Sequence, residues 1–156
     1  MKKLLLNVIL AFACTQLPLM ADDKVPSGYE PLSNLQGVIK ESAGKKLIVL
    51  MAHGRNDKCP NCAAAVKNGE RAIGTGVMKV FVRAEEFNAM DKSQLPASLQ
   101  ARGAKKFIGG ASVYFLVFDP QMEKIIAESS RMELQNNAKL TAEFKKVVQE
   151  AKQKIK

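Results

Sequence analysis

The stretch KLIVLMA-HGRNDK-CPNCAAAVKNGERAI, residues 46–73, decides the fold. Its first seven residues form a continuous apolar run with too few polar breaks for a half-exposed strand, so we expect a central strand covered on both faces. A polar loop follows, and the Ala-rich residues 59–73 predict a helix that ends at Gly74 and Gly76. Two cysteines, Cys59 and Cys62, are therefore expected at the start of a helix that directly follows a buried strand.

The flanking sequence predicts further elements on both sides of this unit. We expect helices over 33–41, 96–102 and 138–156, and strands over 77–84, 113–118 and 124–127. The first helix has capping-box spacing at Ser33 and Gln36. A strand–helix–strand start implies a parallel pair, and a late hairpin implies an antiparallel edge. The prediction is an α/β fold: a central mixed sheet of about four strands, flanked by helices on both faces.

The N-terminal residues have the pattern of an export signal. Lys2 and Lys3 precede an apolar run over 4–13 that is too short to span a bilayer, and Ala21 is a plausible cleavage residue. We therefore expect a signal peptide over 1–21, a leader loop over 22–31 and one domain over 32–156. An alternative is a lipoprotein anchored through Cys14, although the preceding Ala11 and Phe12 depart from that pattern.

The charge of the chain does not indicate a nucleic-acid partner. The formal net charge is +9, but the lysines are spread along the sequence and no basic run is interleaved with aromatic residues. We interpret them as solvated surface, so membrane contact is expected only if Cys14 carries a lipid.

The two cysteines suit thiol–disulfide exchange. A two-residue spacer on the first turn of a helix brings the sulfurs close enough to form a Cys59–Cys62 disulfide. Unpaired N–H groups and the dipole at the helix N-terminus favour a thiolate on the first cysteine, and the cation of Lys58 favours it further. Pro60 is tolerated because its missing N–H would have no partner there. Cleavage after Ala21 leaves this pair as the whole cysteine content, so any thiol chemistry depends on it.

The order strand–CPNC–helix, strand, helix, strand–turn–strand–helix over residues 31–156 resembles the thioredoxin-like superfamily. The resemblance implies that Cys59 is the nucleophile and Cys62 the resolving thiol. Pro60 and Asn61 make the motif similar to the Cys-Pro-x-Cys pairs of glutaredoxins and periplasmic thiol oxidases. No cofactor is implied.

Three positions depart from the family pattern. Val113 stands where the family has a cis-proline, and because a cis bond before a non-proline residue costs about 2.5–4 kcal/mol, we expect a trans bond. Lys58 replaces the tryptophan that commonly precedes the first cysteine. Leu50 and Met51 lie where the family has a buried acidic residue that helps move a proton from the second cysteine.

These departures leave two alternatives open. One is a non-catalytic binding module in which Cys59–Cys62 is a static disulfide. The other is a copper or zinc carrier through His53, Cys59 and Cys62, since one imidazole and two thiolates suit these metals. The simpler interpretation of His53 is a strand-end residue with a satisfied hydrogen bond. The adjacent Glu85 and Glu86 are expected to be a solvated loop pair.

The sequence as a whole predicts an exported thiol–disulfide oxidoreductase. Its partners would be thiols or disulfides of exported proteins and a separate redox partner. We expect a monomer that is periplasmic or secreted after signal cleavage.

Overall fold

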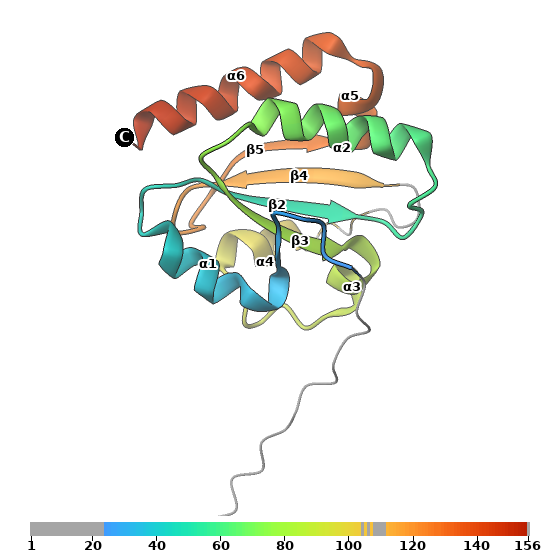
Figure 1. The fold of residues 1–156 in the computed structure, drawn as a ribbon. Coiled ribbons are helices and arrows are strands. Elements are labelled where there is room, and N and C mark those ends of the chain that lie inside the picture. The colour runs from blue at the N-terminus through green and yellow to red at the C-terminus, as the bar shows by residue number, and fades with distance from the viewer. Residues whose placement is uncertain (1–23, 104, 106, 108–111, 156) are drawn as a thin grey trace, which may run out of the picture.

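The computed structural model describes residues 24–103, 105, 107 and 112–155 (Figure 1). The predicted signal peptide, with Cys14, lies outside the described residues. Within the described part, no helix has the length and apolar character that crossing a membrane requires.

A five-stranded mixed sheet forms the centre of the molecule, in the order β1-β3-β2-β4-β5. The strands are β1 (Glu30–Pro31), β2 (Ile48–His53), β3 (Met78–Arg83), β4 (Val113–Phe118) and β5 (Ile125–Ser130). The expected number of about four strands was wrong by one, because β1 lies at the end of the predicted leader loop. Because β1 has only two residues, it is too short to show a periodic sequence pattern.

The central strand β2 pairs parallel with β3 and antiparallel with β4. All six of its residues are buried, as the unbroken apolar run predicted. The parallel pair and the antiparallel hairpin β4–β5 are both confirmed.

Helices cover both faces of the sheet (Figure 1). They are α1 (Leu35–Ser42), α2 (Pro60–Ile73), α3 (Ala84–Ala89), α4 (Ala97–Gly103), α5 (Arg131–Asn136) and α6 (Ala138–Lys154), with a short 3-10 helix over Leu32–Asn34. Residues of α1, α3 and α4 form one apolar core with the sheet, and residues of α2, α5 and α6 form the other. The predicted α/β architecture is thus confirmed at the level of its layers.

Successive side chains of a strand point to opposite faces of the sheet, so every second residue of β2 faces α2. On β2, Val49 and Met51 belong to the core beneath α2, whereas Ile48 and Leu50 belong to the opposite core. Because side chains alternate between the two faces of a strand, His53 shares the face of Met51. On neighbouring strands, Phe81 and Val113 also lie in the α2 core.

Two short helices were not predicted, and one cap lies elsewhere than expected. The sequence analysis assigned no helix to α3 or α5, which have six residues each. Asn34, not Ser33, is the N-cap of α1, and its side chain makes no capping hydrogen bond. A carboxylate cap is found instead at α5, where Glu133 accepts hydrogen bonds from the backbone N–H and the hydroxyl of Ser130 (2.7 and 3.0 Å).

Candidate active site

The two cysteines lie at the N-terminus of α2, as predicted. Cys59 is the N-cap, with extended backbone, and Pro60 occupies the first helical position. The Cys59 sulfur accepts a hydrogen bond from the backbone N–H of Cys62 at 3.3 Å. A sulfur therefore does here what a serine or aspartate oxygen does at other helix N-caps.

The two thiols differ in exposure. Both are free in this structure, which therefore represents the reduced pair. Cys59 is partly exposed, whereas the side chain of Cys62 is almost completely buried in the core between α2 and the sheet. Only the first sulfur is open to a disulfide on another molecule.

The same geometry separates the acidities of the two thiols. The pKa of Cys59 is lowered, first by the hydrogen bond from the Cys62 thiol and then by the backbone N–H groups of Cys62 and Asn61. The positive charge of Arg131 lowers it further. Burial raises the pKa of Cys62 to about 11, and the hydrogen bond to Cys59 adds to this rise. Cys59 is therefore the more acidic of the two thiols, and Cys62 is the one that holds its proton to higher pH.

Sequence analysis did not single out Arg131, whose charge acts on the candidate nucleophile. Arg131 begins α5, 72 positions after Cys59 in the chain (131 − 59), and no local pattern links the two. Lys58, proposed from the sequence as the activating cation, is an exposed loop residue. The cation identified as lowering the pKa of Cys59 is Arg131.

Val113 shares a buried core with Cys62. It is the first residue of β4, pairs with His53 and is completely buried in the core that contains Cys62. Cys59 packs against this same core. The described residues contain no cis peptide bond, which confirms the expected trans bond before Val113. Gly110 and Ala111 before it lie outside the described residues.

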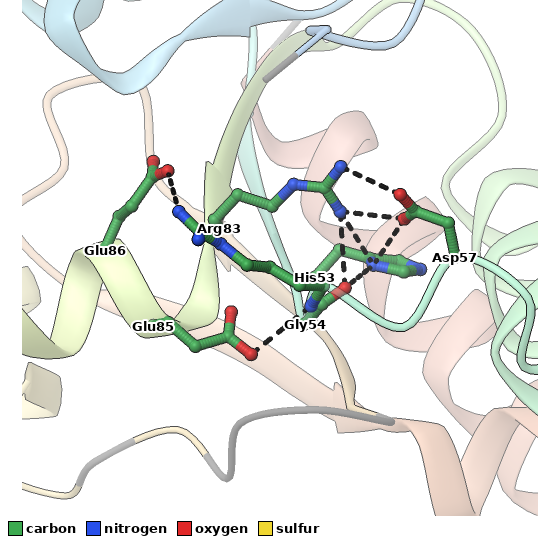
Figure 2. A network of polar contacts seen from close by, with 7 residues as sticks. His53, Gly54, Asp57, Arg83, Glu85 and Glu86 are labelled. Carbon is green, nitrogen blue, oxygen red and sulfur yellow. Dashed lines mark hydrogen bonds and ion pairs between the residues drawn. The ribbon is translucent and has the colours of Figure 1, made fainter. Parts of the chain in front are cut away.

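A polar network holds the loop that leads into the cysteine motif (Figure 2). The Arg83 guanidinium binds both carboxylate oxygens of Asp57, at 2.8 and 3.1 Å, and donates to the carbonyl of Gly54 at 3.3 Å. The hydrogen bond from Arg83 holds the pKa of Asp57 below its usual range. Arg83 is itself buried, so the end of β3 anchors the middle of the loop.

Further contacts fix the remaining sides of this loop. Gly54 donates its N–H to the carbonyl of Ser112 at 2.9 Å, which joins the loop to the segment before β4. Arg55 pairs with Glu86 at 3.1 Å and donates its N–H to Glu85 at 3.3 Å (Figure 2). The interpretation of these glutamates as a solvated loop pair was wrong, because both belong to the first turn of α3 and bind the loop.

His53 is part of this network, which confirms the simpler prediction of a strand-end residue with a satisfied hydrogen bond. It is the last residue of β2 and is buried. Its Nδ1 contacts the carbonyl of Gly54 and the Arg83 guanidinium (Figure 2). Among the described residues, no group of three His, Cys, Asp or Glu side chains is arranged to hold a metal ion. The structure therefore does not bring His53 together with Cys59 and Cys62.

Comparisons of the chain with protein-family models, with curated proteins and with solved structures found no match. The function has to be argued from the geometry of the cysteine pair.

Proposed function

We propose that this protein is an exported thiol–disulfide oxidoreductase with a thioredoxin-like fold, acting through Cys59 and Cys62. The observation that supports the proposal is the difference between the two sulfurs. The partly exposed Cys59 sulfur accepts the backbone N–H of Cys62 at 3.3 Å at the helix N-terminus, and its pKa is lowered. The buried Cys62 thiol has a raised pKa of about 11.

The reaction follows from this difference. The Cys59 thiolate attacks one sulfur of a substrate disulfide; a new S–S bond forms, the old S–S bond breaks, and the substrate's other sulfur leaves as a thiolate. Cys62 then loses its proton to solvent and attacks the Cys59 sulfur of the mixed disulfide. This second exchange forms the Cys59–Cys62 disulfide and releases the remaining substrate thiolate. Two electrons pass from the cysteine pair to the substrate, and a dithiol donor must return them.

The burial of the Cys62 side chain suits the role of resolving thiol. Its high pKa keeps it from competing as the first nucleophile, because the thiolate is the attacking species. Its hydrogen bonding to Cys59 keeps it beside the sulfur that it must attack. The proposal of a thioredoxin-like fold is supported by the five-stranded mixed sheet, by the helices on both faces and by a cysteine pair that follows the central strand.

Insulin reduction by the purified protein, with dithiothreitol as electron donor, tests the proposal. We expect turnover above the dithiothreitol background in the parent protein and none in Cys59→Ser. Cys62→Ser should instead accumulate a mixed disulfide with insulin, because the resolving thiol is missing. A mass increase equal to one insulin chain, lost on reduction, identifies that species.

The same experiment distinguishes the static-disulfide alternative. A binding module would show no turnover in the parent protein and no mixed disulfide in Cys62→Ser. Either result, obtained with folded protein, would reject the proposed reaction.

A further inference from the structure

The first turn of α5 contains a cation and an exposed apolar side chain that the exchange chemistry does not by itself require. Arg131 and Met132 are the first two residues of α5. Met132 is 74% exposed, the highest exposure among the large hydrophobic side chains of the described residues. A single exposed apolar side chain is ordinary on a protein surface, so the charge of Arg131 is the feature that distinguishes this turn.

The sheet register places this turn of α5 at the cysteine end of the molecule. His53 on β2 pairs with Val113 on β4, and Tyr114, the next residue of β4, pairs with Ser130 on β5. Arg131 follows Ser130 directly. Leu134 of α5 lies in the same buried core as Cys62 and Val113, and Cys59 packs against that core. The charge of Arg131 also acts on Cys59, which agrees with this placement.

Arg131 differs from the other arginines near the sheet ends in its partners. Arg55, Arg83 and Arg102 each form an ion pair with a carboxylate. Within the described part of the chain, Arg131 donates to the amide oxygen of Gln135 at 2.8 Å and no carboxylate lies within ion-pair distance of it. Its charge is therefore not neutralised by a carboxylate of the described residues.

The carboxylates of Glu133 and Asp57 already have hydrogen-bond or ion-pair partners. The Glu133 carboxylate accepts hydrogen bonds from the Ser129 hydroxyl and from the backbone N–H of Ser130. Asp57, in the loop before Cys59, is held by Arg83. Lys58 adds an exposed cation next to Cys59. Arg131 and Lys58 are thus cations at the cysteine end that form no ion pair with a carboxylate of the described residues.

We propose that Arg131, Met132 and Lys58 form a docking surface for substrate polypeptides that carry an Asp or Glu next to the disulfide under attack. This inference rests on the proposed function and names its substrate class. The carboxylate pairs with Arg131, and an apolar substrate residue covers Met132. An exposed ion pair contributes up to about 1 kcal/mol, and a contribution of about 0.4–1 kcal/mol corresponds to a preference for an acidic over a basic neighbour of about two- to five-fold in kcat/KM.

Two disulfide-bonded peptides that differ only in the residues flanking the cysteine, Glu in one and Lys in the other, provide the test. A neutral small disulfide, hydroxyethyl disulfide, reports the intrinsic reactivity of Cys59. The parent protein should prefer the Glu peptide by two- to five-fold at low salt and lose the preference at high salt. Arg131→Glu should reverse the preference, after each rate is divided by the rate with hydroxyethyl disulfide.

Arg71 supplies the matched control. It lies in the last turn of α2, away from the cysteine end, and it forms no ion pair with a described carboxylate. Arg71→Glu makes the same change in net charge and should leave the preference intact. Equal rates for both peptides in the parent protein, or a preference unchanged in Arg131→Glu, would overturn the inference while leaving the proposed function standing. No reaction with any of the three disulfides would instead count against the function itself.

Discussion

At the scale of single residues, one sulfur and its hydrogen bonds support the proposed thiol chemistry. Cys59 occupies a helix N-cap and receives N–H groups from the turn that follows it, while Cys62 stays buried and protonated. The sequence predicted this difference from the position of the pair alone. It did not predict the contribution of Arg131, because that contribution depends on a contact between segments far apart in the chain.

Replacement of Arg131 measures its effect on the thiolate. Arg131→Gln should raise the pKa of Cys59, because removing a nearby cation destabilises the negative charge. The thiolate absorbance in the ultraviolet, followed against pH, reports the change. Arg71→Gln, at the other end of α2, should leave the titration unchanged, and a shift of equal size in both variants would contradict a local effect.

The Asp57–Arg83 pair makes a pH-dependent contribution to stability. The folded-state pKa of Asp57 is lower than its unfolded value, so the pair stabilises the fold above the unfolded pKa of about 3.9 and this contribution disappears as the pH falls through the folded pKa. Asp57 is 64% exposed at its side chain, so solvent screening limits the contribution to about 1 kcal/mol.

Asp57→Asn should therefore lower the free energy of unfolding by about 1 kcal/mol near pH 7. Urea denaturation at neutral and at acidic pH provides the comparison with the parent protein. The difference between the two proteins should shrink once the pH is below the folded pKa of Asp57. A difference that stays constant across this range would show that the carboxylate charge is not responsible.

At the scale of elements, the long apolar patterns were predicted correctly, whereas β1, α3 and α5 were not predicted. The strand before the cysteines, α2, β4 and α6 each have enough residues for a periodic or continuous apolar signal. The strand β1 and the helices α3 and α5 are too short for that signal, and tertiary contacts determine them. The start of α5 did have a recognisable local sign, since Ser130 and Glu133 have capping-box spacing.

The close approach of α2 to β4 gives a test of packing at this scale. Gly69 lies on the buried side of α2, and a Cβ placed there would be 2.3 Å from the ring of Phe115. Phe115 is completely buried and cannot move aside freely. Gly69→Ala should therefore destabilise the protein by about 1–3 kcal/mol, although alanine favours helix formation.

Gly37→Ala is the matched control for this prediction. Gly37 is also helical, but its Cβ would meet the side chain of Asn34, which is exposed and can rotate away. This variant should be neutral or more stable by up to about 1 kcal/mol. Thermal unfolding of both variants distinguishes them; a Gly69 variant as stable as the Gly37 variant would show that α2 lies farther from β4 than described.

At the scale of the whole molecule, the residues of the candidate site lie at one end of the sheet. Arg83 connects the loop before Cys59 to β3 (Figure 2). Arg55 connects the same loop to α3, and Ser112 connects it to the segment before β4. This bracing fixes the position of the loop that leads into the cysteine pair. The sequence predicted the loop as a polar connection but not its partners, which come from three separate segments.

The predicted export signal has a consequence for the mature chain. Cleavage after Ala21 predicts an N-terminus at Asp22 and a protein with two cysteines. Intact mass measurement of protein purified from the exported fraction should give the mass of residues 22–156. A mass that retains Cys14 with attached acyl chains would support the lipoprotein alternative instead.

The difference in reactivity between Cys59 and Cys62 is the most direct test of the whole account. Iodoacetamide labelling of the reduced protein across a range of pH, with the label located by peptide fragmentation, measures it. The account predicts that Cys59 is labelled with a midpoint below about 8.5, the value for an ordinary cysteine, while Cys62 stays unlabelled until much higher pH. Equal labelling of the two cysteines, or a Cys59 midpoint at or above the ordinary value, would contradict it.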